Sequence, residues 1–342
     1  HLRNGNCKSA LDCLGESDTE FSDRSELRRV LLSLEPRLRT LILFHDDCLA
    51  HTARTSTDWE GPDRLSAIMG RLQDPKEFPE YELEVSSQFE KAAVDLLGRV
   101  HSAEYITFVD NLSKSMVKPE APVGGKFAAG SDRDHVFFAD EGGGESLSSG
   151  GAAGNFVVPF TPHVQKAMLR QNSDEVKAPE YCDTAFSAGT LRAARRAAGA
   201  VAHAVDRILL GRNRNAFCVV RPPGHHAGYR GLLDGGRSCG FCIFNSVAAG
   251  ALHALEHHQQ ERVAIIDLDV HHGNGTEDIV RRYKSPSKLF FFSLHLYDKD
   301  DKVNYEFFPG SGEKDDTAHN IINVPLNPMW VGAPKGPNPT TR

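Results

Sequence analysis

The feature that most constrains the fold is a regular alternation of short apolar runs and amphipathic helical patterns between residues 190 and 294. The apolar runs at 216–220, 263–270 and 289–294 predict strands. Helical patterns occupy the segments before and between them, at 190 to about 210, about 247–257 and 277–283. Because strands joined by helices pair in parallel, we expect an α/β fold with a parallel sheet flanked by helices on both faces.

The first of these helices carries an apolar stripe and meets Gly211 as a stop signal. Helical spacing places the following residues on one side, which we expect to face the core: Leu191, Ala194, Ala198, Val201, Val205 and Ile208.

The chain divides by composition into three parts. Residues 1–38 are polar and predict an N-terminal extension, and the apolar run at 41–44 predicts the first buried strand of a single domain covering 39–330. Nine glycines between Gly124 and Gly154 cannot fill a core, so we predict a Gly-rich insertion at about 118–155. Residues 331–342 predict an irregular tail. Since His1 is not Met, we expect the sequence to start inside a longer chain.

Composition excludes several classes of function. The formal net charge of -7 and the lack of a dense Lys/Arg block argue against direct nucleic-acid binding. No apolar run is long enough to cross a bilayer, so we expect no membrane role. Seven cysteines at irregular spacing indicate free thiols, and therefore an intracellular protein of the nucleus, the cytoplasm or both.

Three ionisable residues lie in the predicted strand at 263–270 or directly after it. Alternation along a strand places Asp267, Asp269 and His271 on the same side. Burying such groups costs several kcal/mol each unless a partner compensates, and a divalent cation compensates carboxylates well. Ligands of open α/β sheets bind beyond the carboxyl ends of the strands, where these residues lie. Taken alone, the run also fits an exposed edge strand or a structural ion pair.

A second motif occupies the end of the strand at 216–220. The sequence Arg-Pro-Pro-Gly-His-His-Ala-Gly at 221–228 places His225 and His226 on a rigid loop. A histidine pair beside a metal site supplies the base for a metal-bound water and the acid for a leaving amine. The two motifs together therefore favour a hydrolytic metal site.

These motifs, with Gly-Phe-Cys-Ile-Phe-Asn at 240–245 and His-Gly-Asn-Gly-Thr at 272–276, resemble the zinc deacetylases of the arginase/deacetylase fold. The resemblance runs from about residue 41 to 330. Pro-Pro-Gly-His-His-Ala and Asn274 are similar to class II enzymes. The resemblance implies zinc-dependent hydrolysis of N-ε-acetyl-lysine in histones or other proteins, with release of acetate.

The resemblance also implies the cation sites. Asp269 and His271 correspond to the first two zinc ligands, which suits a catalytic zinc with an open position. An inner K⁺ site corresponds to Asp267, Ser293 and Leu294 together with the two zinc ligands.

The remaining site residues are implied in the same way. His226 corresponds to the principal general base and acid and His225 to its neutral or electrostatic partner, oriented by Asp267, while Asn274 supports His226. Phe241 and Phe308 correspond to the aromatic walls of the acyl-lysine channel, and Gly240 is a substrate-binding residue beside them. Asp183 falls near the place where related enzymes hold the substrate backbone.

The sequence departs from the family in two ways. Deacetylases of this fold take a third zinc ligand, an Asp, from a later strand, and an oxyanion-stabilising Tyr from a Gly-Gly-Tyr loop. The 342 residues contain neither, so we expect the domain to be incomplete at the C-terminus and the chain to be nearly inactive. Residues 60–65 resemble the segment at the pocket rim, although the residues before them are unusual.

Other functions stay open at this stage. An acetylpolyamine amidohydrolase shares the fold and motifs, and an acidic residue at the pocket rim would favour it. The absence of the third zinc ligand and of the Tyr also fits a catalytically inactive fragment that acts as a scaffold for corepressor proteins. A ureohydrolase with two manganese ions needs more Asp residues than the strand end offers. Cys239 and Cys242 indicate structural thiols, and His45, His257 and His258 indicate surface or loop positions.

Overall fold

The computed structural model describes residues 21–52, 59–116, 157–160, 183–231, 238–300 and 305–328. The predicted insertion at about 118–155 and the predicted tail at 331–342 lie outside these residues, as do residues 1–20 of the predicted extension. The domain boundaries therefore stay a prediction.

The first sheet has the order β2-β1-β5 and all its strands are parallel. The central strand β1 (Thr40–Leu43) buries Leu41, Ile42 and Leu43, as expected of a strand covered on both faces. Its neighbours are β2 (Leu83–Ser86) and β5 (Asn215–Cys218). The helical segments nearby in the chain are α2 (Phe21–Leu34), η2 (Pro36–Leu38), η3 (Asp46–Ala50) and α3 (Asp63–Leu72).

The second sheet has the order β10-β7-β6 and is also parallel. Its strands are β6 (Val263–Asp267), β7 (Leu289–Leu296) and β10 (Ile321–Leu326). The helix α9 (Asn274–Arg282) connects β6 to β7 through η5 (Pro286–Lys288), and η6 (Thr317–His319) precedes β10.

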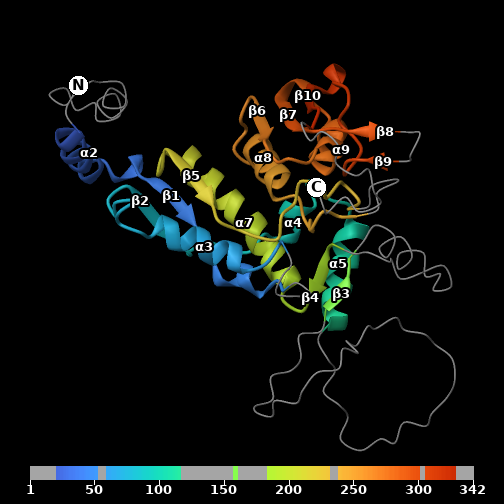
Figure 1. The fold of residues 1–342 in the computed structure, drawn as a ribbon, viewed down its shortest axis with the longest axis horizontal. Helices are drawn as coiled ribbons and strands as arrows, with labels where there is room; N and C mark the ends of the chain where they lie inside the picture. The colour runs from blue at the N-terminus through green and yellow to red at the C-terminus, as the bar shows by residue number, and fades with distance from the viewer. Residues whose placement is uncertain are drawn as a thin grey trace, which may run out of the picture.

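Two helices, α7 (Thr190–Leu209) and α8 (Ser246–Glu256), pack against each other between these sheets (Figure 1). The close approach needs small residues, because a Cβ on Gly250 of α8 would lie 2.4 Å from Cγ1 of Val201. The remaining described elements are α4 (Val94–Leu97), α5 (Ala103–Met116), the antiparallel pair β3 (Val157–Pro159) and β4 (Ala185–Ser187), and the antiparallel pair β8 (Lys299–Asp300) and β9 (Tyr305–Glu306).

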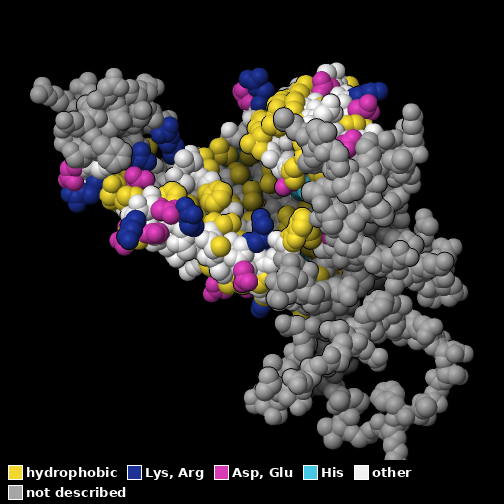
Figure 2. Space-filling view, in the orientation of Figure 1, with side chains coloured by type: hydrophobic (Ala, Val, Ile, Leu, Met, Phe, Trp, Pro, Cys, Tyr) yellow, Lys and Arg dark blue, Asp and Glu magenta, His cyan; other side chains and the backbone are white. Residues whose placement is uncertain are grey.

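The predicted class, parallel strands flanked by helices, is confirmed, but the described strands form two three-stranded sheets. Each sheet has an edge strand with exposed apolar residues: Phe217 on β5 is 50% exposed, and Ile266 and Leu268 at the end of β6 are 55% and 70% exposed. Figure 2 shows hydrophobic side chains around the hollow between the two parts of the molecule.

Two details of the sequence prediction were wrong. Strand β6 ends at Asp267, because the chain bends directly after it. The buried residues of α7 are mainly alanines, whereas Val201, Val205 and Ile208 are only partly buried. Helix α7 contacts α8, β1 and β5, so its small residues face several neighbours and one apolar stripe does not describe its buried surface.

Candidate metal centre

The end of β6 brings two predicted zinc ligands together. The backbone amide of Asp269 donates to Oδ1 of Asp267 (3.1 Å), and the amide of His271 donates to Oδ1 of Asp269 (2.8 Å). These bonds curl the chain so that Nδ1 of His271 lies 3.1 Å from the same Asp269 oxygen. Both side chains are partly exposed, at 49% for Asp269 and 36% for His271. One carboxylate and one imidazole therefore meet at a place that solvent reaches.

The histidine pair that follows β5 reaches the same place. The rings of His225 and His226 lie 4.0 Å apart, and the ring of His226 lies 6.0 Å from that of His271. Nδ1 of His225 lies 2.9 Å from Oδ2 of Asp267, and its Nε2 lies 3.9 Å from Oδ1 of Asp269. The loop that follows β5 thus meets the end of β6, although the two strands belong to different sheets.

Asn274 fixes the tautomer of His226. Its side-chain oxygen Oδ1 lies 2.8 Å from Nδ1 of His226, so this nitrogen carries the proton and donates. The other ring nitrogen, Nε2, then keeps its lone pair and can accept a proton. Asn274 is the first residue of α9, so the helix start positions the imidazole.

The two histidines have opposite electrostatic environments. Burial lowers the pKa of His226 well below 6.5, and the neighbouring His225 and His271 lower it further. Burial would also lower the pKa of His225, but the hydrogen bond and charge of Asp267 outweigh it and raise the pKa. The two imidazoles of the pair therefore have pKa values shifted in opposite directions.

Two phenylalanines border the pair. The ring of Phe308 lies 4.8 Å from that of His226 and 5.7 Å from that of His271. The ring of Phe307 stacks on His271 with a centroid distance of 5.3 Å and an interplanar angle of 8°. These contacts give the partly exposed His271 an apolar support.

The loop at Gly240 and Phe241 approaches His226 from another direction. Gly240 has a φ of +51°, and a Cβ on it would lie 2.2 Å from Cδ2 of His226, so only glycine fits there. The backbone amide of Phe241 donates to Oγ1 of Thr184 (2.8 Å), and this hydroxyl donates to Oδ1 of Asp183 (2.8 Å). The structure therefore links Asp183 to the loop that carries Phe241.

The predicted potassium residues come from neighbouring strands. Asp267 on β6 is paired in register with Ser293 on β7. Ser293 is fully buried, and its hydroxyl lies 2.9 Å from Nδ1 of His295. Leu294 follows Ser293 and is paired with Val324 on β10.

Asp269 and His271 fit a zinc ion by their chemistry and spacing. Carboxylate oxygen and imidazole nitrogen are zinc donors, and two ligands of a tetrahedral site with bonds of 2.0–2.1 Å lie about 3.3 Å apart. The observed separation of 3.1 Å is close to this value. Within the described residues, no third histidine, cysteine or carboxylate forms a ligand group with these two. A catalytic zinc usually has three protein ligands.

A buried ion pair that the sequence did not predict holds the start of the histidine loop. Nε and Nη2 of Arg221 lie 2.8 and 2.7 Å from the two carboxylate oxygens of Glu60. The guanidinium also donates to the backbone oxygen of Cys48 (3.1 Å) and to that of His51. Glu60 is only 9% exposed, so it anchors the loop and does not line a pocket rim. A buried arginine requires a carboxylate partner, but the sequence around Arg221 does not indicate which carboxylate this is.

Known proteins resemble this chain in sequence and in fold. The family model described as "Histone deacetylase domain" matches residues 58–333. The chain belongs to the histone deacetylase family. It is 30% identical to "Type-2 histone deacetylase 1" of Dictyostelium discoideum over 80% of this chain and 17% of that protein. It is 28% identical to "Polyamine deacetylase HDAC10" of Homo sapiens over 86% of this chain and 35% of that protein.

The similarity extends to solved structures. A crystal structure of the HDA15 HD domain matches with a TM-score of 0.57 and 28% identity, covering 84% of this chain and 62% of that one. The chain therefore spans less than two thirds of the length of these relatives. The expected resemblance to the class II deacetylases and their fold is confirmed. None of the described helices combines the length and apolar character of a membrane span.

Proposed function

We propose that this site hydrolyses the amide bond of N-ε-acetyl-lysine in histones or other acetylated proteins and releases acetate, with Zn²⁺ as cofactor. The observation that carries the proposal is the position of His226: its Nδ1 is bonded to Asn274, and its ring lies 6.0 Å from that of His271. A zinc hydrolase needs a base at this position beside its metal ligands.

Each residue has a role in this proposal. Asp269 and His271 would hold zinc, which would supply a Lewis acid for the acetyl carbonyl and the attacking water. Nε2 of the neutral His226 accepts a proton from the water, and the ring then donates this proton to the lysine nitrogen as the C–N bond breaks. His225, paired with Asp267, stabilises the negative charge that develops on the acetyl oxygen.

The aromatic residues suit an uncharged substrate stem. Phe308 lies beside His226, and the Gly240–Phe241 loop packs against the same ring. We infer that Phe241 and Phe308 hold the methylene chain of acetyl-lysine and that Asp183 binds the substrate backbone. K⁺ at Asp267, Ser293 and Leu294 would support the strand ends.

Full activity requires two further groups that the family resemblance implies: an Asp ligand and an oxyanion-binding Tyr. We propose that the 342 residues alone hydrolyse acetyl-lysine at a negligible rate. We also propose that the protein is intracellular, in the nucleus, the cytoplasm or both. We propose further that it can bind corepressor proteins. The thiols of Cys48, Cys218 and Cys242, which form no disulfide within the described residues, support a reducing compartment.

The test is acetate release by a form extended to include these two groups, with an acetyl-lysine peptide and an N-acetylated polyamine as substrates. We expect faster hydrolysis of the peptide and loss of activity when a chelator removes the metal. Faster hydrolysis of the polyamine would show a polyamine deacetylase. No hydrolysis of either substrate by the zinc-loaded protein would contradict the proposal and favour a scaffold.

A further inference from the structure

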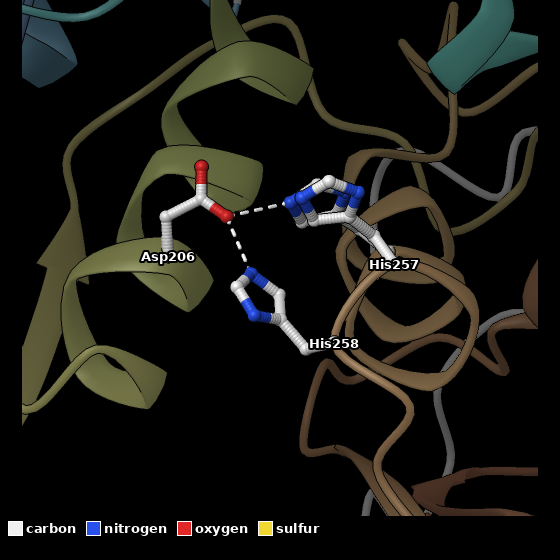
Figure 3. A group of neighbouring side chains, drawn as sticks. Asp206, His257 and His258 are labelled. Carbon is white, nitrogen blue, oxygen red and sulfur yellow. Dashed lines mark hydrogen bonds and ion pairs between the residues drawn. The ribbon is translucent and has the colours of Figure 1, made fainter.

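Three histidines and one aspartate gather at the contact between α7 and α8, away from the residues assigned above. Asp206 is on α7, His253 is on the last turn of α8, and His257 and His258 directly follow that helix. One potential ligand atom of each lies within 4.8 Å of those of all the others. Figure 3 shows Asp206 facing His257 and His258. We call these four residues the α7–α8 histidine cluster.

Two of the histidines point at the same oxygen. Nε2 of His253 lies 2.7 Å and Nε2 of His258 lies 2.6 Å from Oδ1 of Asp206. The side chains of both histidines are largely buried, at 12% and 15% exposed, whereas that of Asp206 is 39% exposed. The two imidazoles are therefore fixed by their surroundings in the protein, whereas the carboxylate of Asp206 is accessible to ions from solvent.

His257 completes the set. Its spacing from His253 is one helical turn, so both rings lie on the same side of α8. The rings are stacked with a centroid distance of 4.7 Å and an interplanar angle of 9°. The amides of His257 and His258 both donate to the backbone oxygen of His253, at 3.0 and 3.3 Å, which fixes the backbone of the three histidines.

We propose that the α7–α8 histidine cluster is a second metal site, which binds Zn²⁺ and joins α7 to α8. Imidazole nitrogen and carboxylate oxygen are both zinc donors, and three imidazoles with one carboxylate supply the four ligands of a closed tetrahedral site. The hydrogen-bonded atoms would separate from 2.6–2.7 Å to about 3.3 Å, the spacing of ligands around zinc. Zinc binding would also turn one of the stacked rings of His253 and His257, so that both lone pairs point at one ion, and the protons on the two Nε2 atoms would move to Nδ1.

A purely structural role for the cluster makes a different prediction. Hydrogen bonds from His253 and His258 to Asp206 can join the helices without metal, and they do not use His257. His257 is exposed and contacts the other two rings. A metal site uses its imidazole as a ligand, so His257 distinguishes the two roles.

The experiment is a calorimetric titration of Zn²⁺ into the 342-residue chain carrying Asp269→Asn and His271→Asn, which removes the ligands of the proposed catalytic zinc. We expect one zinc per chain in this background. Adding His257→Ala should weaken binding at least about tenfold. Adding His319→Ala is the matched control, because His319 bonds to a single carboxylate, Asp316, at 2.9 Å. It should leave binding unchanged.

Two further readouts separate the metal site from a hydrogen-bonded cluster. Co²⁺ in the same background should give the intense visible absorption of four-coordinate cobalt, and His257→Ala should remove it. Circular dichroism checks that each variant is folded. Absence of stoichiometric zinc in the background protein, or equal affinities of His257→Ala and His319→Ala, would overturn the proposal. Neither result bears on deacetylation, because the ligands at Asp269 and His271 are already removed.

Discussion

At the scale of single residues, buried polar groups around the histidine loop make pairs whose loss has a calculable cost. His101 is 1% exposed. Its Nδ1 donates to the backbone oxygen of Gly228 (2.8 Å), and its Nε2 accepts from the amide of Asn245 (2.9 Å). Only the neutral ring can make both bonds, because a charged ring has no acceptor.

The first prediction concerns this residue and pH. Burial lowers the pKa of His101 from 6.5 to about 4, although Asp278 acts in the opposite direction. The unfolded chain then binds more protons than the folded one in this interval, so stability is complete above pH 6.5 and falls toward pH 4. The loss should reach about 3 kcal/mol, measured by urea unfolding across this range. His101→Gln should flatten the curve, and an unchanged curve would contradict the assignment.

The second prediction compares a buried ion pair with an exposed one. Glu60→Gln leaves the guanidinium of Arg221 buried without its charge partner and should cost about 3–5 kcal/mol of unfolding free energy. Glu26→Gln is the control, because Glu26 and Arg29 are 62% and 58% exposed and solvent screens their charges, so this substitution should have a much smaller effect. Equal effects in chemical denaturation would show that the Arg221 pair does not anchor the histidine loop.

At the scale of elements, the bounds of α7 and α8 were predictable from sequence, whereas the start of α9, predicted at 277 and observed at Asn274, and the end of β6 were not. The bounds of α7 and α8 differ by about one residue from those expected, because amphipathic spacing and the glycine stop are local signals. The apolar alternation continues past Asp267, but the backbone bonds of Asp269 and His271 to neighbouring carboxylates end β6 there. Local polar bonds can override a strand pattern.

The third prediction uses two helical glycines with different surroundings. A Cβ on Gly70 in α3 would meet no atom within 4 Å, so Gly70→Ala should stabilise the protein by about 0.5–1 kcal/mol. A Cβ on Gly199 in α7 would lie 2.0 Å from the backbone oxygen of Glu90, so Gly199→Ala should destabilise it by about 1–3 kcal/mol. Thermal unfolding of both variants measures the signs. Stabilisation by Gly199→Ala would show that α7 is packed less closely.

At the scale of the whole molecule, long-range contacts set the limit of sequence reasoning. The family resemblance implied the pairing of His225 with Asp267, and the structure contains it, with Nδ1 of His225 lying 2.9 Å from Oδ2 of Asp267. Arg221 and Glu60 are 161 residues apart, and Asp206 and His253 are 47 apart. No motif links the members of either pair. His257 and His258 were therefore predicted as surface residues, and the structure places them in a cluster.

The fourth prediction concerns the exposed sheet edge at β6. Exposed apolar residues on an unpaired sheet edge promote self-association. Leu268→Lys adds a charge next to the β6 edge and should reduce self-association, measured by sedimentation at increasing protein concentration. Leu34→Lys is the control, since Leu34 is 64% exposed on α2 and belongs to no sheet. If both variants behaved like the original chain, the β6 edge would not be the associating surface.

The central claim is that His226 is the proton-transfer group of a hydrolytic zinc site formed with Asp269 and His271. The most direct measurement is the rate of acetate release from an acetyl-lysine peptide by the extended form, with His226 present or replaced by Ala, and with zinc content determined in both. Because general acid–base catalysis contributes about 10²–10⁴-fold, His226→Ala should lower the rate by at least about 10²-fold while zinc stays bound. Equal rates in the two zinc-loaded proteins would contradict the claim.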